Sequence, residues 1–160
     1  MADGGTLFLD EICEMHPDLQ IKLLRFLQSG KIQRVGSAAA EPVDVRIICA
    51  TNRNPAAEAE AGRFRKDLFY RLHVLALSMP ALRERDGDVL VLARRLLAAY
   101  AAEEAKIFRR LSSACETVLL DYCWPGNIRE LQNVIRRAVV FNDAEELEAD
   151  SPEWHELPAG

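Results

Sequence analysis

The chain has 160 residues, of which 49% are hydrophobic and 7% aromatic, so it can bury a core as one domain or as a domain with a small annex. This composition excludes disordered and fibrous classes, and without an 18-residue apolar run or a signal-like start we expect a soluble cytoplasmic protein. The net charge of −5 is unevenly spread, since residues 142–160 carry seven acids and no Lys or Arg. The pattern indicates an acidic tail and no basic nucleic-acid-binding stripe.

The four cysteines do not form a metal-binding pattern. None of them stands in CxxC spacing, and the three histidines are scattered. Cys13 and Cys49 lie at or near the ends of apolar segments, which favours buried free thiols over disulfides or metal ligands.

An apolar segment near the first residue ends in two adjacent acids. Residues 6–9 are short and rich in large apolar side chains, which predicts a central strand buried on both faces. Asp10 and Glu11 follow at its carboxyl end, where α/β sheets place their ligands. An aspartate there can hold Mg²⁺ and a neighbouring glutamate can orient an attacking water. The alternative is a strand that merely ends in two solvated acids.

The next elements alternate between helix and strand. Pro17 suits the first position of a helix and Gly30 its end. Gly62 breaks a later helical pattern, and Pro80 closes the last apolar run. In chain order we expect a helix from Pro17 to Gly30, a loop or hairpin over 31–41, a strand over 43–50, a helical stretch over 56–71 and a third strand over 74–79.

From Glu84 onward the pattern is helical only. Helices are predicted near 88–104, 111–122 and 127–141, with no further strand signal. We therefore expect three parts: an α/β part over 1–80, an α-helical part over 81–141, and an acidic linker or frayed tail over 142–160.

Polar and basic residues after the second strand form two candidate groups. Thr51 and Asn52 follow that strand directly, and such an amide could reach a phosphate, although a turn started by Asn52 and Asn54 explains it as well. Arg65 and Arg71 belong to a basic cluster with Arg63 and Lys66. These arginines could serve a neighbouring subunit's phosphate or form a solvated helix face.

The segment WPGNIREL at residues 124–131 is the sharpest local signal. Asn127 is a good N-cap, and Glu130 stands three residues later, as in a capping box. Arg129 then lies in the first helical turn, where the helix dipole disfavours a cation by about 0.3–1 kcal/mol. A cation there indicates a task such as meeting an anion, or else a pair with a neighbouring acid.

The order of these signals resembles the central AAA+ domain of sigma-54-dependent transcriptional activators, the NtrC-like enhancer-binding proteins. The resemblance covers residues 2–141 and rests on the segments GGTLFLDE (4–11), RVG (34–36), ATNR (50–53), FRKDLFYRL (64–72), PALRER (80–85) and WPGNIREL (124–131). It implies the later strands of a partial AAA+ parallel sheet, an α/β fold, followed by an all-α lid.

The resemblance also implies roles. Asp10 and Glu11 match the Walker B pair, for Mg²⁺ and for water activation, and Thr51 and Asn52 match sensor I. The remaining matches are Arg65 and Arg71 with the arginine fingers that act across a ring interface, Arg129 with sensor II in a segment where Asn127 also faces the nucleotide, and Arg34 and Val35 with the insertion that relays nucleotide state.

Departures from the family pattern limit what the chain itself can do. The phosphate-binding loop and the GAFTGA loop that touches sigma-54 would both lie upstream of Met1, as would any receiver domain, and a DNA-binding helix-turn-helix is also absent. Cys13 replaces a usual glycine, and His73 a usual asparagine. The complete protein is expected to bind ATP and Mg²⁺, form a ring, usually a hexamer, and remodel sigma-54 RNA polymerase, whereas this chain alone should not hydrolyse ATP.

Two other functions remain open at this stage. The chain could be a regulatory module that only binds partners through its lid and arginine helix, or part of another AAA+ machine such as a helicase loader or chelatase subunit. In the family the phosphate-loop strand lies between the sensor I strand and the last strand. We therefore expect residues 74–79 to pair elsewhere, or copies of the chain to pair through exposed strand edges.

Overall fold

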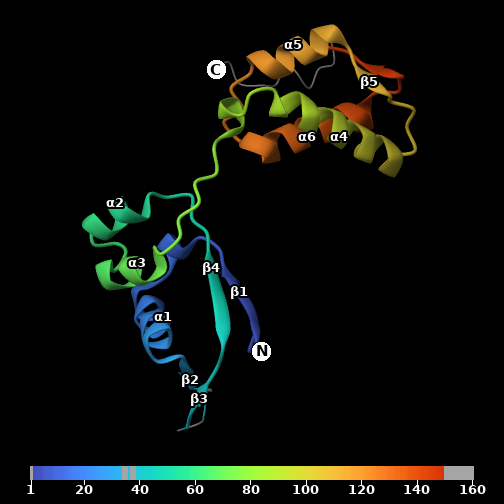
Figure 1. The fold of residues 1–160 in the computed structure, drawn as a ribbon. Coiled ribbons are helices and arrows are strands. Elements are labelled where there is room, and N and C mark those ends of the chain that lie inside the picture. The colour runs from blue at the N-terminus through green and yellow to red at the C-terminus, as the bar shows by residue number, and fades with distance from the viewer. Residues whose placement is uncertain (1, 34–35, 37–38, 150–160) are drawn as a thin grey trace. The chain divides into compact units, whose positions relative to one another are not determined.

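The computed structural model describes residues 2–33, 36 and 39–149, and the chain divides into two compact units, residues 1–77 and 78–160. Figure 1 shows the elements of each unit, which are described separately. No helix within the described ranges is long and apolar enough to cross a membrane.

The first unit is built on a pair of parallel strands. β1 (Gly5–Leu9) pairs with β4 (Val45–Cys49), with Leu9 opposite Cys49. The helices α1 (Pro17–Ser29), α2 (Pro55–Glu60) and α3 (Lys66–Leu72) lie on one side of this pair (Figure 1). The core between strands and helices consists of Ile12, Cys13, Leu24, Phe64 and Leu68.

The expected bounds of α1 and the break at Gly62 are confirmed. Pro17 is the first residue of α1, and Gly30 ends it in the left-handed conformation with a φ of 65° that glycine adopts without strain. The expected hairpin is the antiparallel pair β2 (Lys31–Gln33) and β3 (Ala40–Pro42). Arg34 and Val35 lie outside the described residues.

The prediction that the first strand is buried on both faces is wrong. In β1 the side chains of Leu7 and Phe8 are 38% and 57% exposed. Within the described residues β1 has one neighbouring strand, β4, and the helices cover one face of the pair. The composition of the segment fits a central strand, but burial depends on neighbours that composition does not supply.

The prediction of a third strand over residues 74–79 is also wrong. This stretch has no regular secondary structure and pairs with no strand in the described part of the chain. Leu75 and Leu77 are 91% and 93% exposed. An extended apolar segment becomes a strand only when a partner satisfies its backbone groups, and among the described residues no strand lies beside this one.

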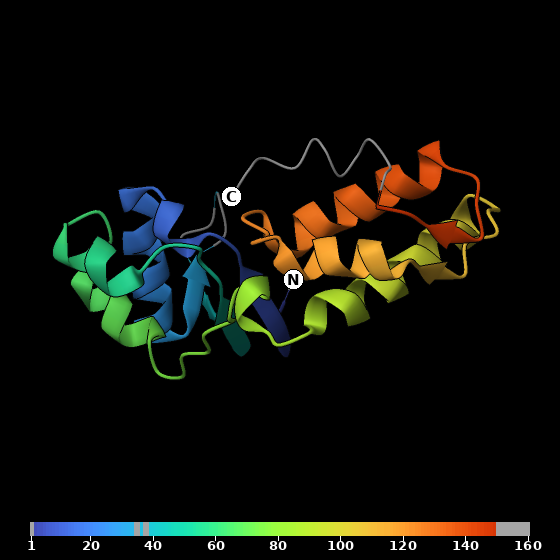
Figure 2. The same ribbon diagram turned by 90° about the horizontal axis from the view of Figure 1, so that it is seen from above.

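The second unit is a group of three helices. α4 (Asp88–Glu103), α5 (Ser113–Asp121) and α6 (Asn127–Phe141) confirm the expected helices, and the 3-10 helix η2 (Leu82–Glu84) precedes them. α4 packs against both α5 and α6, and Figure 2 shows the three helices from a second side. Their shared core includes Leu97, Leu119, Trp124, Leu131 and Ile135, each at most 2% exposed.

The helix-only expectation for this unit needs a correction. β5 (Arg110–Leu111) pairs in parallel with β6 (Glu146–Leu147). Leu147 is 1% exposed and belongs to the core of the unit. The segment expected to be a linker or frayed tail is therefore packed at this point, because a single buried leucine anchors it.

Candidate functional site: a carboxylate and amide edge beside an arginine loop

The carboxyl ends of β1 and β4 bring the predicted polar residues together. The Ala50 N–H donates to the Leu9 carbonyl at 2.9 Å, and the Ile12 N–H donates to the Ala50 carbonyl at 3.0 Å. These bonds continue the parallel pairing past the strands. Asp10 and Glu11 therefore lie next to Thr51 and Asn52, as parallel strands that end at one edge require.

The backbone turns sharply between the two acids. Glu11 adopts a left-handed conformation with a φ of 51° and a ψ of 46°, which is uncommon for a residue other than glycine. Asp10 is exposed and its Oδ1 accepts the Glu11 N–H at 3.0 Å, whereas Glu11 Oε2 accepts the Asn52 N–H at 3.4 Å. The turn thus directs the second carboxylate towards the end of β4 and leaves the first facing solvent.

Of the residues after β4, Thr51 and Asn54 bond to the turn, whereas the Asn52 side chain is open to a ligand. Thr51 Oγ1 accepts the Arg53 N–H at 3.2 Å, and Asn54 Oδ1 caps α2 by accepting from Ala56 and Ala57 at 3.1 and 3.2 Å. The interpretation of Asn54 as a turn-forming residue thus holds, and Thr51, which was not part of that interpretation, also bonds to the turn. The Asn52 side-chain amide is exposed and makes no hydrogen bond within the described ranges, so it is available to a ligand.

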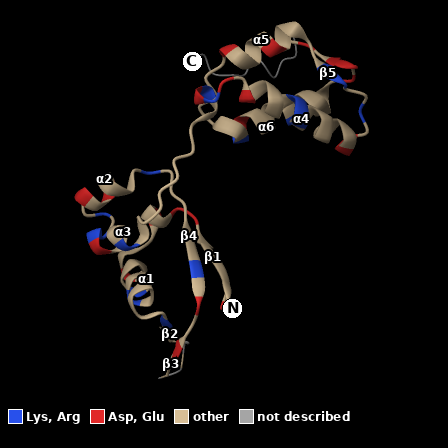
Figure 3. Cartoon of the chain, in the orientation of Figure 1, with Lys and Arg blue, Asp and Glu red and all other residues tan. Residues whose placement is uncertain are grey.

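The two predicted arginine fingers lie at opposite ends of α3, Arg65 directly before the helix and Arg71 in its last turn. The Arg65 guanidinium binds Asp67 through two bonds, Nε to Oδ1 at 3.0 Å and Nη2 to Oδ2 at 2.7 Å. This contact holds the pKa of the Asp67 carboxyl below its usual range. Arg71 donates from Nη2 to the Leu27 carbonyl of α1 at 3.1 Å. Both arginines are exposed, and acidic and basic residues alternate around α2 and α3 (Figure 3).

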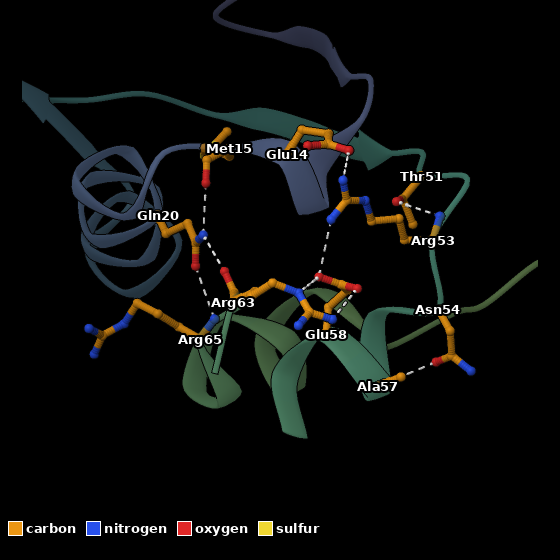
Figure 4. Close-up of polar contacts among 10 residues, drawn as sticks. All are labelled: Glu14, Met15, Gln20, Thr51, Arg53, Asn54, Ala57, Glu58, Arg63 and Arg65. Carbon is orange, nitrogen blue, oxygen red and sulfur yellow. Dashed lines mark hydrogen bonds and ion pairs between the residues drawn. The ribbon is translucent and has the colours of Figure 1, made fainter. Parts of the chain in front are cut away.

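A buried carboxylate between these two groups escaped the sequence analysis. Glu58 is 8% exposed and accepts from Arg63 at 2.7 and 2.9 Å and from Arg53 at 3.4 Å (Figure 4). Its hydrogen bond with Arg63, together with the charges of both arginines, lowers the pKa of Glu58 to about 2. Arg53 also pairs with Glu14 of the 3-10 helix η1 (Ile12–Glu14). The sequence signal that could have indicated this pair is Glu58 five residues before Arg63, with Gly62 between them.

The start of α6 differs from the predicted N-cap. The residue before the helix is Gly126, and Asn127 has a left-handed φ of 54°. In this conformation Asn127 Oδ1 accepts the Leu82 N–H of η2 at 2.7 Å instead of capping its own helix. Glu130 does reach back, since its Oε2 accepts the Gly126 N–H at 2.8 Å.

Arg129, at the start of α6, has no partner among the described residues. Its guanidinium is exposed and makes no hydrogen bond or ion pair with any described residue. The alternative that Arg129 is paired with a neighbouring acid is therefore not what the structure shows. An unpaired cation at a helix N-terminus is disfavoured by the helix dipole unless an anion meets it.

The acids of this edge suit a nucleotide-linked metal ion rather than a metal cage. No group of three or more His, Cys, Asp or Glu side chains in the described part of the chain could hold a metal ion. Mg²⁺ in nucleotide sites is held by one or two carboxylates together with phosphates and waters. The exposed Asp10 carboxylate could supply such a ligand to Mg²⁺ beside the phosphates of a nucleotide.

Comparisons with known proteins show the family. Residues 1–78 match the sigma-54 interaction domain family, and residues 83–153 match an AAA+ ATPase lid domain. The regulatory protein LuxO of Vibrio cholerae serotype O1 is 54% identical over 149 residues, 93% of this chain and 33% of LuxO. The alginate biosynthesis transcriptional regulatory protein AlgB of Pseudomonas syringae pv. tomato is 50% identical over 158 residues, 99% of this chain and 35% of AlgB. The chain thus spans about a third of the length of these relatives.

Solved structures lead to the same family. NtrX from Brucella abortus has a TM-score of 0.86 at 35% identity, covering 94% of this chain and 35% of NtrX. NtrX in complex with ATP has a TM-score of 0.86 at 35% identity, covering 96% and 37%. The predicted fold class, part of an AAA+ parallel sheet with a helical lid, is confirmed. The chain therefore belongs to the sigma-54 interaction domains, the AAA+ domains of sigma-54-dependent transcriptional activators.

Proposed function

We propose that this chain supplies the water-activating, phosphate-sensing and interface arginine residues of an ATPase that remodels sigma-54 RNA polymerase. The observation that supports this most directly is the junction of Asp10, Glu11 and Asn52 at one strand edge, held by the bonds between Leu9, Ala50 and Ile12. That NtrX was solved in complexes with ADP and with ATP supports nucleotide binding in this family.

Each residue has a proposed role in ATP hydrolysis. Asp10 would hold Mg²⁺, which neutralises charge on the phosphates, and Glu11 would orient the attacking water. Asn52, whose side-chain amide makes no hydrogen bond with a described residue, and Thr51 would sense the terminal phosphate. Arg129, on the lid, would bind phosphate oxygens. The bond from the Leu82 N–H to Asn127 would order the helix start that carries it. Arg65 and Arg71 are exposed on the surface, as a residue that serves a neighbouring subunit must be.

The partners follow from the family. We propose self-assembly into a ring, with six subunits as the expected number, and contact with the sigma-54 holoenzyme in the bacterial cytoplasm. Enhancer DNA would be bound through residues outside this chain, since no basic stripe stands in its sequence.

The test uses this chain alone and within a complete regulator. The 160 residues contain no G-x-x-x-x-G-K-[ST] sequence, so the chain alone should show neither tight Mg²⁺-dependent ATP binding nor hydrolysis. Vibrio cholerae LuxO in which this chain replaces the matching residues should hydrolyse ATP. Glu11→Gln in that chimera should lower kcat about 100-fold or more while ATP still binds. Tight ATP binding by the isolated chain, or full turnover by the Glu11→Gln chimera, would overturn the proposal.

A second candidate is a regulatory module that binds partners without hydrolysing ATP. The observation in its favour is that the chain itself presents both arginines proposed for the interface, Arg65 directly before α3 and Arg71 in its last turn. Adding the chain to intact LuxO should then inhibit its ATPase in proportion to concentration, and Arg65→Ala should weaken that inhibition. ATPase activity that stays constant at every ratio would count against this candidate.

A further inference from the structure

Gln20 is a buried polar residue on the face of α1 that packs against the arginine loop, residues 61–65. Its side chain is among the most enclosed in the molecule, at 1% exposed. Nε2 donates to the Met15 carbonyl at 2.8 Å and to the Arg63 carbonyl at 3.2 Å. Oε1 accepts the Arg65 N–H at 2.9 Å (Figure 4). Both N–H groups of the amide and its oxygen are therefore hydrogen-bonded to backbone atoms.

These contacts fix the arginine loop on both sides of one residue. Arg63 and Arg65 flank Phe64, whose side chain is 2% exposed in the core of the first unit. Phe64 holds the loop by packing, and the Arg63 and Phe64 N–H groups donate to the Glu58 carbonyl at 3.0 and 3.1 Å. Gln20 adds a second bond to the Arg63–Phe64 peptide group, through the Arg63 carbonyl, and it binds the next peptide group through the Arg65 N–H.

An apolar residue at this position would leave the Met15 and Arg63 carbonyls and the Arg65 N–H without the partner that Gln20 gives them. The neighbours of Gln20 on α1 include Leu24, which is part of the same core, and a buried amide costs free energy unless its bonds are all made. What the amide adds over a leucine or methionine of similar size is direction: it holds the Arg65 backbone at a φ of −68° and a ψ of 131°.

We propose that Gln20 is the positioning residue for Arg65, fixing the backbone from which that arginine reaches the nucleotide of a neighbouring subunit. The inference rests on the proposed function for the role of Arg65. The clamp, meaning the bonds of Gln20 to the Arg63 carbonyl and the Arg65 N–H, rests on the structure alone. Gln20 does not touch the nucleotide. It acts through the Arg65 peptide group, while the Asp67 carboxylate holds the guanidinium itself.

The first experiment tests the clamp in this chain by amide hydrogen exchange. In the wild-type chain the Arg65 amide and the Gln20 side-chain amide should both be protected. Gln20→Met keeps the volume and removes the bonds, so Arg65 exchange should quicken about 10-fold or more while helix α6 in the second unit stays unchanged. Gln28→Met is the matched control, because Gln28 is an exposed residue of the same helix. Unprotected wild-type Arg65 and Gln20 amides would overturn the clamp, even if Gln20→Met did not fold.

The second experiment tests the role in catalysis, in the LuxO chimera. A displacement of a catalytic group by about 1 Å can cost about 100-fold in rate, so Gln20→Met should lower kcat about 10- to 100-fold with little change in the KM for ATP. Gln28→Met should leave kcat unchanged. In an Arg65→Ala background the Gln20→Met change should have almost no further effect, since the residue that it positions is gone.

The outcomes separate the two proposals. A wild-type chimera without ATPase activity would contradict the proposed function, while the exchange data would still decide the clamp. Equal kcat losses from Gln20→Met with and without Arg65 would overturn the positioning role, because a general loss of stability does not depend on that arginine.

Discussion

Glu58 makes the stability of the first unit sensitive to acid. Its pKa in the folded chain is about 2, against an ordinary value of 4.5, because Arg63 and Arg53 stabilise the charged form. A lowered pKa means that the unfolded chain binds more protons between these two values, so the stabilisation is complete above about 4.5 and is lost as the pH falls towards 2. The loss concerns the link between Arg53, beside the strand edge, and Arg63 in the arginine loop.

We predict that Glu58→Gln flattens this acid dependence. The free energy of unfolding, measured by urea titration from pH 6 to pH 2.5, should fall less steeply for Glu58→Gln than for wild type, and at pH 6 the variant should be the less stable protein. Glu60→Gln is the matched control, because Glu60 is an exposed acid at the end of the same helix. Superimposable curves for wild type and Glu58→Gln would show that Glu58 does not carry the effect.

The short strand β6 attaches the C-terminal part of the second unit to its core. Leu147 is 1% exposed, and the Ser112 N–H donates to its carbonyl at 3.0 Å. We predict that Leu147→Ala lowers the free energy of unfolding of this unit by about 2–5 kcal/mol, the usual cost of truncating a buried leucine. Leu120→Ala, at a leucine 53% exposed, should cost far less. Chemical denaturation monitored at Trp124 in the core of this unit provides the measurement, and equal effects of the two changes would contradict the packing of β6.

Some helices and strands could be predicted from the sequence and others could not. α1 and β4 carry their signals locally, in Pro17, Gly30 and an apolar strand pattern, and both form as expected. The strand edge of the site was predictable because parallel strands that end together place their next residues together. The strand over 74–79 was not, since a strand depends on a neighbour.

The residues that fix the arginine loop were beyond sequence-based prediction for a different reason. Gln20 binds backbone atoms 43 and 45 residues away, and any residue type supplies a carbonyl and nearly any an N–H. No spacing rule marks such a contact. Asn127 is a similar case, because its partner is the backbone N–H of Leu82, and the capping pattern suggested a local bond instead.

For the molecule as a whole, exposed apolar surface gathers on the first unit. β1 has β4 on one edge and no strand on the other within the described residues. The segment from Val74 to Met79 exposes Leu75 and Leu77 almost completely. Unpaired strand edges and extended apolar segments are the features through which copies of a chain associate.

We therefore predict that the isolated chain self-associates through these features. Its sedimentation coefficient should rise with concentration, and replacing Leu75 and Leu77 together by Lys should shift the chain towards monomer with an unchanged circular dichroism spectrum, because charge on an exposed segment opposes strand addition. Ile107→Lys is the control, since Ile107 is 61% exposed in the second unit and should leave association unchanged. A wild-type chain that remains monomeric at every concentration would contradict the prediction, and would show that neither the exposed edge of β1 nor the segment over 74–79 drives association.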